Sequence, residues 1–252
     1  MNKISVNNIA ATAIIYSVDN PSQIFIERKT DDYPVKVFAG VLCTPGGNWV
    51  GHGAKDDANP EATIRRELEE EFSLVPSEGG ADEMGVLGYN AGADGRDLQK
   101  NTQATAEDIE CFAQVKEAML SAVTPFMDAL VTIPKTLFDS ADPENKRGDT
   151  TLLISYFLVG LSGEDWDKLV RLQEKYGNLS NESETRIVTV DEMCQQSMKV
   201  SWGHDRALGH FLLMKGIEKR IPTFDGISCQ LRKSLSSYNE YKETYEIARQ
   251  PQ

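Results

Sequence analysis

Three glutamates lie close together in one short segment of the sequence, and together they could bind a divalent cation. They are Glu67, Glu70 and Glu71. Their spacing of i, i+3 and i+4 places the three carboxylates side by side if the segment is an α-helix. Carboxylates clustered on one rigid helix are the oxygen ligands that a hard cation such as Mg²⁺ prefers. The segment therefore predicts a metal site.

A solvated acidic face is the alternative interpretation of the same segment, because the chain is rich in acids. Two features favour the metal site. The glutamates border an apolar stripe and do not oppose it, since Ile64, Leu68 and Phe72 share the adjacent face of the helix. In addition, Thr44-Pro45-Gly46-Gly47 ends an apolar segment just upstream, and glycines there let a backbone approach a ligand closely.

The helix that carries the glutamates has clear boundary signals. Asn59 can cap it, Pro60 suits the first turn, and Glu61 is favoured at the positive end of the helix dipole. The helix is predicted to end near Phe72, before Pro76.

Strands are expected before this helix. Residues 9–18 and 23–29 read as strands that flank a turn at 19–22, and an apolar stretch at 35–43 reads as a third strand.

The rest of the chain predicts alternating helices and strands. We expect strands at 84–89, 151–161 and 186–190, and helices at 107–122, 166–176, 191–193 onward and 204–219. Residues 90–103 read as a polar loop, and Pro125 suggests a short helix start. The tail after Ser234 reads as a surface helix or a frayed end. No repeat or low-complexity linker interrupts this order, so one elaborated α/β domain is expected.

These residues resemble the box of the Nudix hydrolase family. That box reads Gly, five residues, Glu, seven residues, Arg-Glu-aliphatic, any, Glu-Glu, any, Gly, aliphatic. Arg66-Glu67-Leu68 and Glu70-Glu71 match its helical half, and Thr44-Pro45-Gly46-Gly47 resembles the turn that opens it. The resemblance implies an α/β/α sandwich with a mixed β-sheet, an insertion at about 90–149 and a C-terminal extension at about 220–252.

The sequence departs from the family pattern in the loop before the helix. The first glutamate of the box would fall on Ala58, and the loop is longer than the pattern allows. Asp56 and Asp57 are both close enough in sequence to replace that glutamate, and the choice stays open. His52 also lies in this loop, where a surface position is the simpler interpretation. Ser73 stands where the family has glycine.

The resemblance implies hydrolysis of a pyrophosphate linkage in a nucleoside diphosphate joined to another group, such as ADP-ribose, a nucleotide sugar or a dinucleotide. Mg²⁺, or Mn²⁺, would be held by Glu67, Glu70 and Glu71. Arg66 would fix a carboxylate of the box, and backbone groups of Gly46 and Gly47 would approach a phosphate. Glu184, or Glu182, would supply a further ligand or the general base; ordinary loop acids are an equal alternative.

The segment after the acidic helix is the candidate specificity element or homodimer contact. Aromatic residues that could stack on a base are Tyr89, Phe126, Tyr156 and Trp202. A core position is the simpler expectation for each of them.

The amino-acid composition narrows the classes of partner that the protein is expected to bind. Lys and Arg total 26 against 39 Asp and Glu, which gives a net charge of −13. This excess disfavours nucleic acid and anionic membranes, and no apolar run suits a membrane span or a secretory signal. The cysteines Cys43, Cys111, Cys194 and Cys229 form no CxxC pair, so reduced thiols in a cytoplasmic protein are expected.

Two rival functions remain open at this stage. One is a Nudix-fold sensor or regulator that binds a nucleotide without cleaving it. The other is an interaction protein whose acidic run is only a solvated surface.

Overall fold

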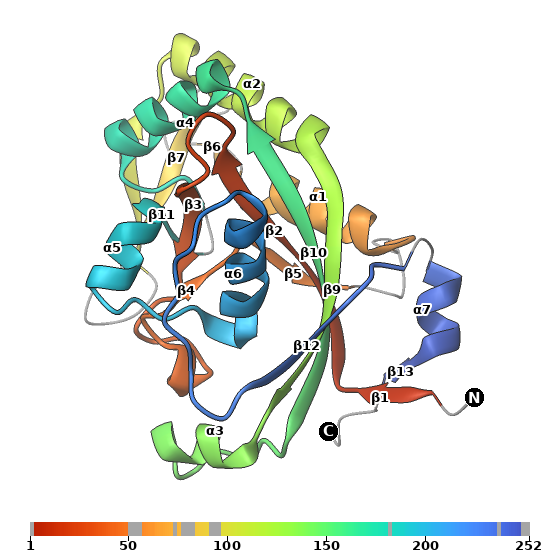
Figure 1. Cartoon of the computed structure of the whole chain (residues 1–252). Coiled ribbons are helices and arrows are strands. Elements are labelled where there is room, and N and C mark those ends of the chain that lie inside the picture. Colours follow the sequence, from red (N-terminus) through yellow and green to blue (C-terminus); the bar gives the residue numbers. More distant parts are fainter. Residues whose placement is uncertain are drawn as a thin grey trace.

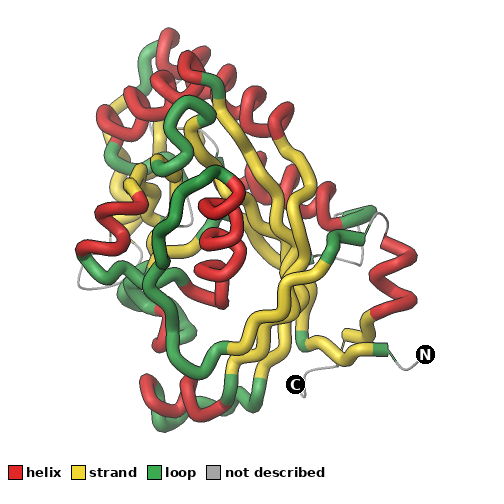
Figure 2. The backbone as a smooth tube through the Cα atoms, in the orientation of Figure 1, coloured by secondary structure: helices red, strands yellow, loops and turns green. Residues whose placement is uncertain are grey.

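A computed structural model describes residues 3–49, 57–72, 75–76, 84–90, 97–180, 183–235 and 238–247, with backbone only for 75–76, 84–90, 97–103, 238–239 and 242. A long twisted sheet runs through the molecule, and helices lie on both of its faces (Figure 1). Figure 2 shows that loops gather mainly around the ends of this sheet. The α/β class, predicted from the alternating pattern, and the mixed sheet that the resemblance implies are confirmed.

The strands are β1 (Ile4–Val6), β2 (Asn8–Ser17), β3 (Gln23–Arg28), β4 (Leu42–Cys43), β5 (Gly46–Asn48), β6 (Val75–Pro76), β7 (Met84–Asn90), β8 (Asp97–Gln103), β9 (Val123–Ile133), β10 (Thr150–Leu161), β11 (Glu184–Thr189), β12 (Ser228–Arg232) and β13 (Tyr245–Ile247). The α-helices are α1 (Pro60–Glu71), α2 (Ala106–Ala122), α3 (Lys135–Ala141), α4 (Gly163–Tyr176), α5 (Val190–Gln195), α6 (His204–Met214) and α7 (Tyr238–Thr244). Short 3-10 turns are η1 (Lys36–Phe38) and η2 (Ser201–Gly203).

The main sheet has the strand order β11-β3-β2-β10-β9-β12. Its centre is the parallel pair β2–β10, and the other neighbours in this order are antiparallel. The strands β2 and β3 pair only through Ile15–Phe25 and Tyr16–Ile24. Beyond that point β4 pairs with β3 and β5 pairs with β2, so the sheet splits in two there.

Residues of β2 alternate between two apolar layers, as a strand buried on both faces requires. Ala11, Ala13 and Ile15 pack with α1, α2 and α4 on one face. Ile14 and Tyr16 pack with α5 and α6 on the other. The acidic helix α1 therefore covers one face of the sheet, and α6 covers the opposite one (Figure 1).

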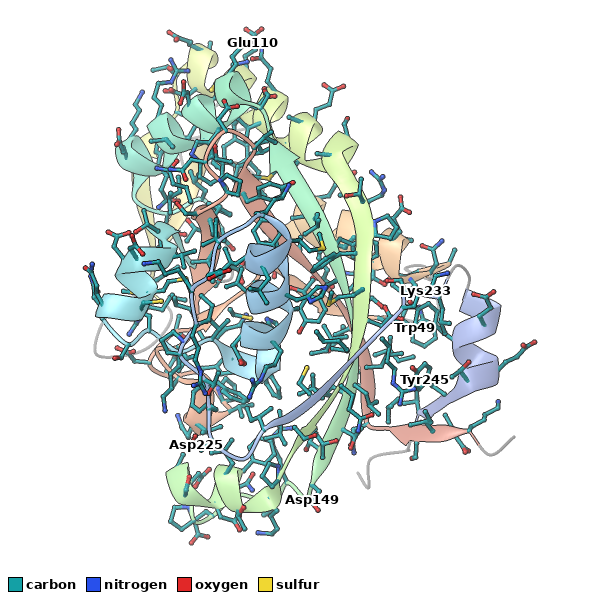
Figure 3. All side chains as sticks on the ribbon, viewed as in Figure 1. Trp49, Glu110, Asp149, Asp225, Lys233 and Tyr245 are labelled. Atoms are coloured by element: carbon teal, nitrogen blue, oxygen red, sulfur yellow. The ribbon has the colours of Figure 1, made fainter. Side chains whose placement is uncertain are left out.

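The C-terminal segment closes the end of the sheet near the N-terminus. β13 pairs in parallel with β1, and Tyr241 and Tyr245 pack with Val6, Ile9 and Leu153. Trp49 lies in the same cluster, and its side chain and Tyr245 are seen together beside α7 (Figure 3). The Tyr241 hydroxyl reaches the buried carboxylate of Asp128 on β9 at 3.0–3.1 Å.

Three local predictions are wrong. The apolar stretch at 35–43 forms η1 and the two-residue β4, not one strand. Residues 97–103 of the expected polar loop form β8. The expected helix after Pro125 is the strand β9, in which the pairing with β10 shifts register beside Pro125. Such an irregularity accommodates a proline, because proline has no N–H for the ladder.

The segment 90–149 thus supplies β9, a strand inside the main sheet. The division of the chain into one domain with an insertion and an extension stays a prediction. Among the described residues, no helix has the length and apolar character that a membrane span requires.

Candidate functional site

Helix α1 begins where the sequence predicts it. The side chain of Asn59 accepts a hydrogen bond from the Ala62 N–H at 2.8 Å, and Pro60 occupies the first turn. The buried residues of the helix include Ile64, Leu68 and Glu71. The apolar stripe thus orients α1 so that Glu67 and Arg66 point along the sheet toward β5.

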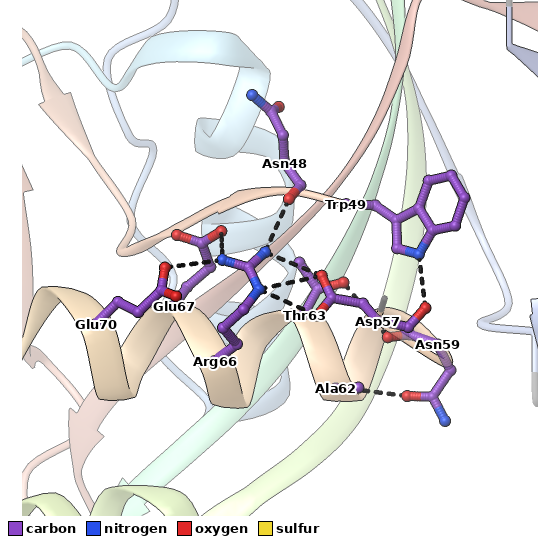
Figure 4. A network of polar contacts seen from close by, with 9 residues as sticks. All are labelled: Asn48, Trp49, Asp57, Asn59, Ala62, Thr63, Arg66, Glu67 and Glu70. Carbon is purple, nitrogen blue, oxygen red and sulfur yellow. Dashed lines mark hydrogen bonds and ion pairs between the residues drawn. The ribbon is translucent and has the colours of Figure 1, made fainter. Parts of the chain in front are cut away.

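Arg66 lies at the centre of an acidic network (Figure 4). Its guanidinium contacts Glu67 at 2.8 Å, Glu70 at 3.0 Å and Asp57 at 2.9 Å. It also donates to the backbone carbonyl of Asn48 on β5 at 3.1 Å. The hydrogen bonds with Asp57 raise the pKa of Arg66 above its ordinary value, so the side chain is a permanent cation. One arginine therefore fixes the geometry of three carboxylates.

Asp57 contacts Arg66 from the loop that carries the sequence departure. Both its oxygens lie within 3.3 Å of the Arg66 Nε, and the Asp57 side chain is 5% exposed. Ala58, where the family pattern has glutamate, is exposed. Of the two candidate replacements, Asp57 contacts the network, and Asp56 and His52 lie outside the described residues.

Gly46 and Gly47 are required by close packing inside the protein. A Cβ on Gly46, which has a φ of +140°, would lie 2.3 Å from the carbonyl oxygen of Ala11 on β2. A Cβ on Gly47 would lie 2.4 Å from the carboxylate of Glu67. The strand β5 therefore touches α1 directly, and Gly47 brings the Glu67 carboxylate against the backbone.

Glu71 points away from Arg66, into the protein. It is 5% exposed and lines a small internal cavity together with Glu27 of β3. This cavity of about 10 Å³ has room for about one water-sized group. Glu27 is 1% exposed and lies 3.5 Å from the ammonium of Lys29. The burial of Glu71 and the 12% exposure of the Glu67 side chain contradict the interpretation of these two glutamates as part of a solvated surface.

Glu27 and Lys29 were missed by sequence reasoning. The signal for them was an acid and a base within a strand whose neighbours Ile24 and Ile26 are apolar. Burial alone would lower the pKa of Lys29, but the nearby Cys43, Glu27 and Glu71 raise it above its ordinary value. Lys29, whose side chain is 17% exposed, is therefore an ammonium ion next to the acidic site.

A cleft of about 260 Å³ opens beside β5, on the face of the sheet opposite α1. Ala10 and Thr12 of β2 and Ile154 of β10 lie in its floor, and Gly46 and Gly47 border it. The cleft lies at the split in the sheet, where the chain passes from β4, which pairs with β3, to β5, which pairs with β2. Gly47, which packs against Glu67, thus borders both the cleft and the acidic helix.

His204 lies in the wall of this cleft, with Cys43 and Thr44 beside it. Its Nδ1 lies 2.6 Å from the Thr44 hydroxyl and 3.9 Å from the Cys43 sulfur. Burial, together with the charge of Lys29, lowers the pKa of His204 to about 3. Burial raises the pKa of the Cys43 thiol. A neutral histidine next to a protonated thiol is not an activated nucleophile.

Glu184 begins β11, where it contacts Arg28 and Arg186, both at 3.3 Å. Its role as a metal ligand or base stays a prediction, and Glu182 lies outside the described residues. Of the four candidate stacking residues, Trp202 borders the cleft. Tyr156 is fully buried, Phe126 packs against His210, and the side chain of Tyr89 is not described.

The metal site predicted from the sequence is not assembled as three converging ligands. Among the described residues, no three His, Cys, Asp or Glu side chains are grouped closely enough to hold an ion. Glu67 and Glu70 contact Arg66, whereas Glu71 faces Glu27. The donor set itself fits Mg²⁺ or Mn²⁺, since all of these groups offer carboxylate oxygens.

No protein-family model and no curated protein matches the sequence. Solved structures similar to this chain include a MutT protein from Methanosarcina mazei Go1, with 14% identity and a TM-score of 0.39 over 87% of this chain and 99% of that one. The E. coli dihydroneopterin triphosphate pyrophosphohydrolase has 11% identity and a TM-score of 0.39 over 84% of this chain and 99% of that one. A NUDIX hydrolase from Alicyclobacillus acidocaldarius has 12% identity and a TM-score of 0.40 over 84% of this chain and 93% of that one.

The similar structures carry the name of the family that the sequence motif resembles. At these identities and TM-scores the similarity assigns no activity, so the function must be argued from the residues.

Proposed function

We propose that the protein is a Nudix-type hydrolase that cleaves a pyrophosphate linkage in a nucleoside diphosphate joined to another group, with Mg²⁺ or Mn²⁺ as cofactor. The observation that carries the proposal is the network in which Arg66 contacts Asp57, Glu67 and Glu70 while Gly47 packs against Glu67. An acidic cluster fixed by one arginine on a rigid helix is suited to holding a divalent cation in a defined place.

The carboxylates proposed to hold the metal are Glu67, Glu70 and Glu71. When bound, the metal neutralises the charge of a diphosphate and lowers the pKa of a coordinated water. Arg66 acts as a positioning residue, because its contacts hold Glu67 and Glu70 on one side of α1. The backbone of Gly46 and Gly47 offers a close approach for a phosphate, and Glu184 is proposed as a further ligand or base.

Substitution of Glu70 tests this proposal. The assay is Mg²⁺-dependent release of product from a panel that contains ADP-ribose, nucleotide sugars and dinucleotides. Glu70→Gln keeps the size of the side chain and removes its charge, and we expect kcat to fall by about a hundredfold or more. Glu69→Gln is the matched control, since Glu69 is the exposed neighbour on the same helix. Equal turnover in all three proteins would refute the assignment.

A second candidate function is nucleotide binding without cleavage. The observation that favours it is the absence, among the described residues, of three grouped metal ligands. Calorimetry that detects nucleotide binding, combined with no turnover in either Mg²⁺ or Mn²⁺, would support this sensor function over the hydrolase.

The proposal also includes a small-molecule partner in place of nucleic acid, a cytoplasmic location and a homodimer. Sedimentation at two protein concentrations tests the homodimer. The expected result is a mass of about twice the 28.0 kDa of one chain.

A further inference from the structure

The cleft beside β5 has the opposite charge to the rest of the protein. The chain carries a net charge of −13, yet none of the described residues that line the cleft is Asp or Glu. The charged side chains in its lining are Lys29 and Arg147. A basic cleft in an acidic protein concentrates anions, because low-dielectric walls focus the local field.

The two cations differ in how they are held. The Lys29 side chain is 17% exposed and its ammonium lies 3.5 Å from Glu27, so this carboxylate holds its position. Arg147 lies on the exposed loop before β10, and its guanidinium forms no ion pair with any residue that the structure describes. An arginine at a cleft rim without a carboxylate partner has its planar set of donors available for a phosphate.

An aromatic pair forms another part of the wall. Tyr33 and Trp202 both line the cleft. The ring of Phe38 packs against Trp202, with 4.4 Å between the two ring centroids. The Trp202 ring is therefore held by packing while it remains partly exposed.

The backbone of Trp202 is strained. Its φ of +55° lies in the left-handed region, which a bulky side chain rarely adopts. Residues held in such conformations occur most often at ligand sites, where the surrounding structure maintains them. In this conformation the Trp202 ring packs on Phe38, and the indole borders the cleft.

We propose that this cleft binds one nucleoside monophosphate unit of the substrate, with the base against Trp202 and Tyr33 and a phosphate at Arg147. The proposal rests on the proposed function for the identity of the substrate. The volume of about 260 Å³ lies near the lower end of ligand pockets, which are roughly 300–1,000 Å³. The cleft therefore holds one nucleoside unit, and the group beyond the pyrophosphate lies outside it, past Gly46 and Gly47.

The test measures binding without metal. Calorimetry in EDTA uses AMP, GMP, CMP and UMP, and the four parent nucleosides. We expect at least one monophosphate to bind to the wild type. Arg147→Gln should lower the affinity for that monophosphate about tenfold, because one charge-assisted contact is lost. The affinity for the parent nucleoside should stay within about twofold of the wild-type value. Arg171→Gln is the matched control, because Arg171 is an exposed arginine on α4 outside the cleft.

Trp202→Gly tests the aromatic wall. Glycine accepts the positive φ at this position, so the backbone conformation is kept while the ring is removed. We expect both the nucleoside and the monophosphate to bind at least about tenfold more weakly, and Trp202→Phe to restore part of the affinity. A melting curve of each variant verifies that it is folded.

The outcomes separate this inference from the proposed function. If Mg²⁺-dependent turnover occurs and its KM is the same in Arg147→Gln, Trp202→Gly and wild type, the cleft proposal is overturned and the hydrolase stands. If binding in EDTA depends on both residues and no turnover is found, the cleft proposal stands and the hydrolase is overturned. Absence of binding by every nucleotide in the folded wild type overturns the cleft proposal.

Discussion

The two faces of the strand β5 carry opposite charge. On the side of α1, one guanidinium is shared among Asp57, Glu67 and Glu70. On the other face, the cleft is lined by two cations and by no carboxylate among the described residues. Gly47, which packs against Glu67, and Asn48, whose carbonyl accepts a hydrogen bond from Arg66, border both regions.

The opposite charges on the two sides of β5 indicate how an acidic protein can bind an acidic ligand. A diphosphate ester has one part that needs a metal ion and another that needs protein cations. In the proposed function, carboxylates would supply the first need by holding the metal, which would locally reverse their sign. Lys29 and Arg147 would supply the second directly. Glycine at the boundary lets the two regions approach within a single strand, because any side chain there would displace Glu67 or the backbone of β2.

Loss of the shared guanidinium should produce the largest effect on stability. In Arg66→Met, the buried Asp57 and the carboxylates of Glu67 and Glu70 lose their cation. We expect the free energy of unfolding to fall by about 2–4 kcal/mol, which lowers Tm by roughly 4–16 °C. Thermal unfolding measures this change. Glu67 and Glu70 also lose their positioning contact, so kcat should fall with stability.

The neighbouring Arg65 provides the control for this substitution. Arg65 forms an ion pair with Glu61, and the two side chains are 39% and 41% exposed. An exposed ion pair contributes only about 0–1 kcal/mol to stability. Arg65→Met should therefore change Tm much less than Arg66→Met. Equal decreases in Tm in the two variants would mean that the acidic network stabilises the fold no more than an exposed ion pair does.

Two residues on the cleft side should make the stability of the fold depend on pH. His204 has its pKa lowered to about 3, so the unfolded chain binds a proton there more readily. Its neutral form stabilises the fold above pH 6.5, and this stability is lost as the pH falls toward 3. Burial raises the pKa of the next residue, Asp205, to about 6. The protonated Asp205 carboxyl therefore stabilises the fold at low pH, and this contribution is lost as the pH rises through 6.

The two contributions, each on the order of 1–3 kcal/mol, largely offset each other in the wild type. His204→Gln should therefore become more stable, relative to wild type, as the pH is lowered from 7 to 4. Asp205→Asn should become less stable over the same range. Unfolding by urea at each pH measures both. If the two variants change in the same direction, His204 is not a neutral component of the cleft.

Much of the fold followed from local signals, and the errors have physical causes. Helix α1 was predictable because Asn59, Pro60 and the apolar stripe agree with one another. The strand β9 was not, because Pro125 resembles a helix start until its place beside a register shift is known. The strand β8 has no apolar alternation, so only its pairing with β7 identifies it.

The site shows a similar division between local and long-range information. The contact between Arg66 and Glu70 follows from their spacing of four residues on a helix. The cleft could not be predicted, because it joins residues from β2, the segment that follows β3, the loop before β10 and η2. Trp202 could be named as a candidate from its residue type alone, but its position at the cleft involves packing against the distant Phe38.

The smallest effect should come from restoring the glutamate that the family pattern places at position 58. Ala58 is exposed, and Asp57 already contacts Arg66 at 2.9 Å. Ala58→Glu should therefore change stability by less than about 0.5 kcal/mol, as surface substitutions do, and leave turnover within about twofold. Asp57→Ala, in contrast, should lower both, because it removes a buried partner of Arg66.

The double variant Asp57→Ala/Ala58→Glu decides which position belongs to the acidic side of β5. If Asp57 performs the function of the missing glutamate because of its buried place beside Arg66, a glutamate at the exposed position 58 will not restore turnover or Tm. Full rescue would show instead that the network needs only a nearby negative charge. In that case the geometry that distinguishes the acidic side from the cleft would be set by Arg66 and Glu67 alone.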